Sequence, residues 1–132
     1  MAKTIVQKVV FKNTAPKALY DLYMNAKKHT AVTQNKAKIS SKAGSAFTAY
    51  DGYIKGKNLQ LVKDKQIIQS WRGHDWKKTD SDSTFIINLE QKGRDTVLHA
   101  THVNVPDEHA EGIRKGWYDC YWNLWKAHLK KK

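Results

Sequence analysis

The C-terminal segment 105–129 limits the possible folds more than any other part of this chain. It holds three of the five tryptophans in the sequence. Its apolar residues recur at spacings of three and four, which is the period of one face of an α-helix. They form two adjacent stripes, one of Ile113, Trp117, Cys120, Tyr121, Leu124 and His128 and the other of Tyr118, Trp122, Trp125 and Leu129. A helix with such a wide aromatic face needs a second layer to cover it, so the segment predicts a long helix packed on other elements.

The residues before this segment supply that layer as a series of strands. Short runs alternate between apolar and polar residues and are separated by turn residues, which is the pattern of half-buried β-strands. The predicted strands are 4–11, 45–50, 53–55, 58–62, 66–72, 83–91 and 96–105. Asp51-Gly52 predicts a two-residue hairpin turn, since glycine readily adopts positive φ.

Two short helices are predicted between the first and second strands. Asn13 or Thr14 is the expected N-cap of the first helix, and Pro16 suits its opening turn because proline lacks a backbone N–H. This helix should end near Asn25, which then caps a second helix over about residues 26–32. The following lysine-rich stretch has weak periodicity and predicts a loop or an irregular strand.

The last helix has both start signals and weakening residues. Pro106 ends the last strand, and Asp107 puts negative charge where a helix begins. Gly112 and Gly116 weaken the first turns, so a bent or frayed opening is expected. The whole order predicts an α+β fold in one domain over residues 1–132. In it, a curved antiparallel sheet of about six to seven strands wraps round the C-terminal helix.

Composition indicates the cellular compartment that we expect for the protein. The 132 residues carry 24 lysines and arginines against 12 acidic residues, a net charge of +12. The single cysteine, Cys120, cannot form an intrachain disulfide, so a reducing, cytoplasmic location is expected. The N-terminal residues lack the apolar core of a signal peptide. Since no apolar run approaches the roughly 20 residues that cross a bilayer, no membrane span is predicted.

A lysine-rich region is the clearest feature of the charge pattern. Residues 22–50 contain no acidic residue but include Lys27, Lys28, Lys36, Lys38 and Lys42. We refer to these five as the lysine surface. Such a surface attracts acidic proteins, nucleic acid or anionic lipid, and solubility alone is the alternative explanation. The chain has three arginines, too few for specific nucleic-acid readout, because lysine lacks the planar fork that reads bases.

His102 is the one candidate for acid–base chemistry. It shares the predicted inner face with Leu98 and Ala100, and histidine titrates near neutrality. No partner carboxylate is identifiable, so a hydrogen-bonded structural histidine is the alternative. His99 and His102 cannot share a metal ion, because strand positions three apart face opposite ways. With no phosphate loop, nucleophile elbow or zinc helix motif in the sequence, we predict no enzyme, no metal and no cofactor.

Residues spread over most of the chain form a familiar series. They are Gly44-x-x-Phe47, Asp51-Gly52, Gly56, Ile67–Trp71-Arg72, Trp76, Thr96-x-Leu98, Val105-Pro106 and Gly116-Trp117-x-x-Tyr121. From about Ile5 to Leu129 the chain resembles the activator of heat shock protein 90 ATPase homologue family, within the START-like (SRPBCC) superfamily. The resemblance implies a helix-grip fold with a cavity between sheet and helix, which many superfamily members use for sterols, lipids or polyketides. It matches the C-terminal domain of the eukaryotic activator and so also implies a chaperone-related, stress-response role.

The expected cavity wall combines the predicted inner faces with this resemblance. Its residues are Phe47, Gln69, Trp71, Phe85, Ile87, Leu98, Ala100, His102, Ile113, Trp117, Tyr121 and Leu124. The first expectation is a non-catalytic protein that binds an apolar small molecule there, although the same rings can instead fill the space as a packed core. The alternative is a chaperone-associated module that binds an acidic partner; nucleic-acid binding and a cyclase-like enzyme are less favoured. Two tryptophans off the first helical stripe either contact a partner or pack against the early helices: Trp122 and Trp125.

Overall fold

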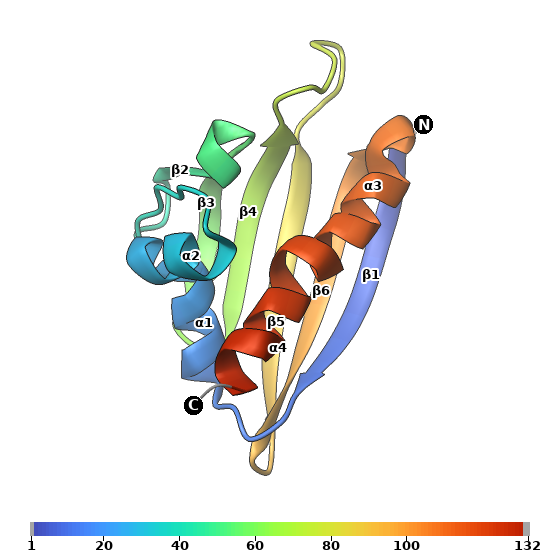
Figure 1. The fold of residues 1–132 in the computed structure, drawn as a ribbon. Coiled ribbons are helices and arrows are strands. Elements are labelled where there is room, and N and C mark those ends of the chain that lie inside the picture. The colour runs from blue at the N-terminus through green and yellow to red at the C-terminus, as the bar shows by residue number, and fades with distance from the viewer. Residues whose placement is uncertain (1, 131–132) are drawn as a thin grey trace.

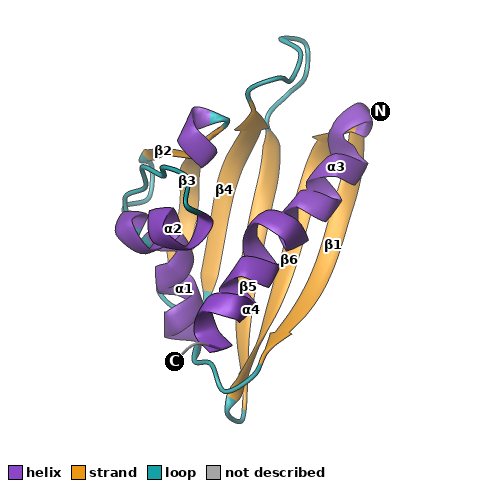
Figure 2. Cartoon of the chain, viewed as in Figure 1, coloured by secondary structure: helices purple, strands orange, loops and turns teal. Residues whose placement is uncertain are grey.

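Six antiparallel strands form one sheet in the order β1-β6-β5-β4-β3-β2 in the computed structural model, which describes residues 2–130. The strands are β1 (Ala2–Phe11), β2 (Ala46–Ala49), β3 (Ile54–Val62), β4 (Gln66–Gly73), β5 (Ser83–Lys92) and β6 (Asp95–Pro106). The α-helices lie on one face of this sheet, where the C-terminal helix runs diagonally across the strands (Figures 1 and 2). These helices are α1 (Pro16–Met24), α2 (Ala26–Thr33), α3 (Asp107–Trp117) and α4 (Asn123–Lys130). The predicted α+β, helix-grip architecture is confirmed.

The early helices form where the sequence predicts them, with one correction at a cap. Asn25 ends α1 and caps α2, because its side chain accepts a hydrogen bond from the backbone N–H of Lys28 at 3.1 Å. The N-cap of α1 is Ala15, which provides no side-chain cap. The predicted cap Thr14 instead donates its hydroxyl to the carbonyl of Lys12 at 2.8 Å, so it stabilises the preceding turn.

The third strand is a single element, although the sequence predicted two separate strands, 53–55 and 58–62. β3 is continuous from Ile54 to Val62, and a register shift between Asn58 and Gln60 interrupts its pairing with β4. The irregularity turns Asn58 into the core and leaves Leu59 exposed, which broke the alternation visible in the sequence. The predicted two-residue turn before β3 is also longer. A short 3₁₀ turn, η1 (Tyr50–Gly52), joins β2 to β3, and all three of its residues have positive φ.

The C-terminal helix contains a π-helical turn, η2 (Tyr118–Trp122), between α3 and α4. Asn123 donates its N–H to the carbonyl of Tyr118, five residues back. Trp117 and Trp122, five apart, therefore both face the sheet and are buried. The fully buried residues Trp117, Tyr121, Trp122 and Trp125 come from both predicted stripes, whereas Tyr118 is exposed, because the helix changes phase at η2. The predicted fraying is wrong, since α3 is helical from Asp107 onward, with acidic residues in its first turn.

Aromatic rings dominate the core between helix and sheet. Trp122 and Trp125 are 0% and 1% exposed, so neither is a contact surface for a partner. Trp125 packs against Phe11 of β1 and Tyr23 of α1, with ring centroids 6.1 and 6.2 Å away. This packing supports the second alternative, contact with the early helices. Among the residues described, no helix has the length and apolar character needed to cross a membrane.

Candidate functional site

The space between the middle of the sheet and the C-terminal helix is filled by stacked rings. Phe85 of β5 lies parallel to Trp117, with centroids 4.0 Å apart and planes inclined by 7°. His102 of β6 meets Phe85 edge-on at 5.2 Å, and Trp71 of β4 meets His102 at 4.8 Å. Such contacts are those of a close-packed interior.

A cleft remains beside this packed centre. Its volume is about 520 Å³, and it lies between the first half of the C-terminal helix and the ends of β3 and β4. We call it the aromatic cleft. Its walls are Tyr50, Tyr53, Ile54, Trp71, Asp75, His109, Gly112, Ile113, Gly116, Trp117, Cys120 and Tyr121.

The predicted cavity residues divide between cleft and core. Four of the twelve line the aromatic cleft: Trp71, Ile113, Trp117 and Tyr121. Seven others are buried in the core outside its wall: Phe47, Gln69, Phe85, Ile87, Leu98, Ala100 and His102. Leu124 of α4 is half-buried and also outside the wall. Sequence reasoning selected the inner face of the sheet, whereas the open space lies between the helix and the ends of β3 and β4.

Two glycines create much of this space. Gly112 and Gly116 are one helical turn apart on α3, and both line the aromatic cleft. A Cβ atom added to either would have no heavy atom within 4 Å. Their spacing of four residues is visible in the sequence, where the low helix propensity of glycine predicts a weakened helix. The same spacing also leaves one helical face without side chains, and this second consequence is the sequence signal for a cleft.

Two tyrosines tie the rim of the cleft to its surroundings. Tyr50 donates its hydroxyl to the carbonyl of Cys120 at 2.7 Å, which joins η1 to the π turn. Tyr53 donates to the Oδ1 of Asp75 at 2.6 Å. This hydrogen bond lowers the pKa of the Asp75 carboxyl, while partial burial, followed by the same bond, raises the pKa of Tyr53 to about 12. The rim thus carries an ionised carboxylate and a protonated phenol at neutral pH.

His102 is held in one neutral tautomer. Trp117 donates its indole N–H to Nδ1 of His102 at 3.1 Å, so Nδ1 carries no proton. Nε2 lies 2.7 Å from Oγ of Ser83, whose hydroxyl donates to the carbonyl of Trp71, so Nε2–H is the donor in this pair. Burial lowers the pKa of His102 to about 3. Both ring nitrogens are engaged and the ring is 1% exposed, which is the arrangement of a structural histidine.

A second buried histidine supports the other side of the cleft. His29 of α2 donates from Nδ1 to the carbonyl of Tyr23 at 2.9 Å, and its Nε2 accepts from the hydroxyl of Tyr121, also at 2.9 Å. Burial lowers the pKa of His29 and raises that of Tyr121. The sequence contained no periodic signal for this pair, since it joins helices 92 residues apart.

Two indole donors near the cleft have no acceptor. The Nε1 atoms of Trp71 and Trp76 are buried and make no hydrogen bond within residues 2–130. The Trp76 ring packs on Trp71 at 5.6 Å and stacks on His109 of the cleft wall at 5.9 Å. Native interiors leave few polar groups unsatisfied, so each case needs a physical explanation.

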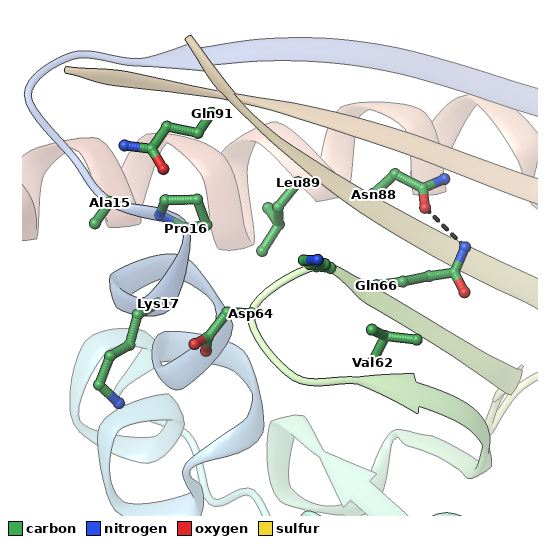
Figure 3. Close-up of a pocket in the computed structure, with 10 residues that line it drawn as sticks. Ala15, Pro16, Lys17, Val62, Asp64, Gln66, Asn88, Leu89 and Gln91 are labelled. Atoms are coloured by element: carbon green, nitrogen blue, oxygen red, sulfur yellow. Dashed lines mark hydrogen bonds between the residues drawn. The ribbon is translucent and has the colours of Figure 1, made fainter. Parts of the chain in front are cut away.

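Two further features lie outside the aromatic cleft. Ligand-type atoms of Asp80, Glu108 and His109 lie within 4.8 Å of one another, a cluster missed in the sequence because a long loop brings Asp80 to the helix. Lys77 Nζ lies 3.5 Å from a Glu108 oxygen, so an exposed ion pair accounts for charge there. A groove of about 710 Å³ lies at the other end of the sheet (Figure 3). Its wall mixes apolar and polar side chains and contains none of the predicted residues: Ala15, Pro16, Lys17, Val62, Asp64, Lys65, Gln66, Asn88, Leu89 and Gln91.

The lysine surface lies on α2 and the loop that follows it. All five of its side chains are exposed. Its loop is held from inside, because the buried Asn58 donates its amide to the carbonyls of Ser40 and Lys42 at 2.7 and 3.2 Å. Asn58 in turn accepts from Gln69 at 2.9 Å. Lys27 and Lys28 are therefore displayed on a helix, and Lys36, Lys38 and Lys42 on a loop that the core holds in place.

Comparisons with known proteins agree with this architecture. The family described as Activator of Hsp90 ATPase homolog 1-like protein matches residues 13–130. The Activator of 90 kDa heat shock protein ATPase homolog of Dictyostelium discoideum is 29% identical over 116 residues, which are 87% of this chain and 30% of that protein. Homolog 1 of Homo sapiens is 27% identical over 108 residues, 82% of this chain and 32% of that protein. This chain thus spans about a third of the length of the curated relatives it matches.

A solved structure shows the same fold over the whole domain. An HSP90 activator from Plasmodium falciparum superposes with a TM-score of 0.84 at 22% identity, covering 96% of each chain. Together with the family match over most of the sequence, these observations show that the chain belongs to the family of Activator of Hsp90 ATPase homolog 1-like proteins.

Proposed function

We propose that this protein binds an apolar small molecule in the aromatic cleft. The observation that carries the proposal is a cleft of about 520 Å³ walled mainly by tyrosine, tryptophan and isoleucine side chains, with Asp75 and His109 as its ionisable carboxyl and imidazole groups. Small-molecule sites in proteins have volumes of roughly 300–1,000 Å³ and walls of this kind. A flat, largely apolar ligand suits walls made of rings.

The surrounding contacts support a preformed site. Tyr121 and Trp117 each line the cleft and each bond to a buried histidine, so neither ring turns freely. The Tyr50 bond to Cys120 fixes the rim beside Tyr121, whose ring lies 5.6 Å from that of Tyr50. A ligand entering such a site loses little free energy to the ordering of side chains.

A cleft-blocking variant tests the proposal. Gly116→Leu places an isobutyl group in the cleft, and the helix backbone accepts leucine better than glycine. The probe is the neutral fluorophore 6-propionyl-2-(dimethylamino)naphthalene, whose emission shifts to the blue in apolar surroundings. Ala127→Leu adds similar apolar bulk to an exposed position of α4 and serves as the matched control.

We expect the wild type and Ala127→Leu to bind the probe and Gly116→Leu to bind it at least ten-fold more weakly. Equal binding by all three proteins would place the probe elsewhere and reject the proposal. Thermal unfolding of each variant verifies that the fold is intact.

A second candidate function is contact with a chaperone of the 90 kDa heat shock class. Family membership and the ordered lysine surface favour it. The test is binding to the isolated middle segment of such a chaperone at two salt concentrations, since exposed charges are screened by salt. Lys27→Glu with Lys28→Glu should weaken binding, and Lys63→Glu with Lys92→Glu, which changes the same charge elsewhere, should not. The same loss in both pairs would show that net charge alone drives the association.

A further inference from the structure

We propose that the ligand of the aromatic cleft carries one positive charge, such as an ammonium group on an aromatic ring system, and that the carboxylate of Asp75 binds this charge. This inference rests on the proposed function and adds the chemical class of the ligand. Asp75 belongs to the cleft wall, lies on the loop that follows β4, and is exposed. A ligand that occupies the cleft can therefore reach it.

The contacts of Asp75 place its carboxylate beside the cleft. Oδ1 accepts from the hydroxyl of Tyr53 at 2.6 Å, and Tyr53 is a wall residue that is 40% exposed. This hydrogen bond is the main cause that lowers the pKa of the Asp75 carboxyl, and the charge of His109, another wall residue, contributes. Because two groups of the wall act on the carboxylate, its negative charge is felt inside the cleft.

This negative charge is not neutralised by a lysine or an arginine. Asp75 forms no ion pair within residues 2–130. None of the twelve wall residues is lysine or arginine, although these two types supply 24 of the 132 residues of the chain. The ionisable groups near the carboxylate are the imidazoles of His74 and His109. Since the net charge of +12 repels cations at long range, a cation that binds needs a local carboxylate of this kind.

The rings of the cleft also favour a cation. The face of an aromatic ring is electron-rich and attracts a cation that lies within about 6 Å of its centre. Tyr53 is the most exposed ring of the wall and is bonded to Asp75, so one ammonium group can contact both. Five of the twelve wall residues are tyrosine or tryptophan: Tyr50, Tyr53, Trp71, Trp117 and Tyr121.

The backbone on both sides of Asp75 is anchored. His74 donates its backbone N–H to the carbonyl of Tyr53 at 2.7 Å. Trp76 is 6% exposed and packs on Trp71, with ring centroids 5.6 Å apart. The carboxylate therefore keeps its place before a ligand arrives, which lowers the cost of binding.

The test compares trimethyl(naphthalen-2-ylmethyl)ammonium with 2-neopentylnaphthalene, in which carbon replaces the nitrogen and removes the charge without changing the shape. Both affinities are measured by displacement of the fluorescent probe from the wild type and from Asp75→Asn. This substitution keeps the oxygen that accepts from Tyr53 and removes the charge. We expect it to weaken binding of the ammonium compound about five-fold and to leave binding of the neutral compound unchanged.

Two further measurements control for position and for overall charge. In ¹⁵N-labelled protein both compounds should shift the amide resonances of Gly112 and Gly116, which line the cleft. Glu90→Gln removes the same charge from an exposed position of β5 outside the cleft wall. It should leave both affinities unchanged.

The outcomes separate this inference from the proposed function. If the neutral compound binds but Asp75→Asn weakens the ammonium compound no more than Glu90→Gln does, the inference is wrong and the proposed function stands. An equal loss of both compounds in Asp75→Asn would mean that Asp75 shapes the cleft, and would also reject the charge assignment. If neither compound binds the wild type, or if both bind Gly116→Leu as tightly as the wild type, the proposed function itself is rejected.

Discussion

The indole N–H of Trp122 donates to Oε1 of Gln7 at 2.7 Å, and the amide of Gln7 donates to the carbonyl of Arg114 at 2.9 Å. These two bonds bracket the π turn. In a regular α-helix that carbonyl would accept from the N–H of Tyr118, which here donates to Lys115. One buried side chain of β1 thus satisfies both a carbonyl released by the π turn and a side-chain donor on the last residue of that turn.

The first prediction concerns this glutamine. Gln7→Leu keeps the volume but leaves the Arg114 carbonyl and the Trp122 N–H unsatisfied in the core, so it should lower the free energy of unfolding by about 2–4 kcal/mol. Urea unfolding followed by fluorescence measures the change. Gln60→Leu, at an exposed position, should stay within about 0.5 kcal/mol of the wild type. A Gln7 variant as stable as that control would show that the π turn does not depend on β1.

A second prediction concerns the close approach of β3 and β4. A Cβ on Gly56 would stand 1.8 Å from the backbone carbonyl oxygen of Ser70 and 2.7 Å from the ring of Phe47. Since backbone atoms cannot move aside alone, Gly56→Ala should destabilise the protein by about 3 kcal/mol or fail to fold. The readout is the midpoint of thermal unfolding. A decrease of less than about 1 kcal/mol in the free energy of unfolding would mean that the strands separate more easily than their packing indicates.

The third prediction is that one pair of substitutions raises stability and weakens binding. Gly112→Ala with Gly116→Ala should raise the free energy of unfolding by about 1–2 kcal/mol, because alanine is the better helix former and both Cβ atoms point into open space. The same methyl groups narrow the aromatic cleft, so the naphthalene probe should bind more weakly. Chemical unfolding and probe titration on one preparation measure both effects. Greater stability with undiminished binding would argue against the cleft as the site.

The fourth prediction concerns acid. Burial lowers the pKa of His102 to about 3 from an ordinary value of 6.5, and it also lowers the pKa of His29. Below pH 6.5 the unfolded chain therefore binds protons that the folded chain does not, and stability falls as the pH drops. Between pH 7 and pH 5 the loss from His102 alone should be about 2 kcal/mol.

Urea unfolding at several pH values measures this slope, and His102→Gln provides the control. Glutamine can accept from Trp117 and donate to Ser83 but does not titrate in this range, so the slope should be smaller in that variant. The ring resonances of His102 should also stay unchanged from pH 8 to pH 5 in the folded protein. Their titration near pH 6.5 would contradict the buried, neutral assignment.

The sequence predicted most of the fold because its signals were local and periodic. Alternation located the strands, and Asn25 located the junction between α1 and α2. The continuous β3 was missed because its irregularity at Asn58 reverses the alternation on which the prediction depended. The phase change in the last helix was missed because a fixed period was applied across Trp117 and Trp122.

The candidate site was less predictable because it depends on which space the rings leave open. Inner-face periodicity grouped Trp71 with Phe85, yet one lines the cleft and the other stacks on Trp117. Only the packing of several elements decides between these places. The hydrogen bond from Trp117 to His102 likewise joins residues 15 apart on different elements, so no local pattern in the sequence predicts it.

The π turn changes how the C-terminal helix responds to the number of its residues. Trp117 and Trp122 are five residues apart, and removing the exposed Asp119 would place them four apart, the spacing at which a regular α-helix presents two side chains on one face. Trp125 would then keep its contacts with Phe11 and Tyr23. The π turn therefore holds one residue more than the register of the helix on the sheet requires, and a deletion there leaves the core in place.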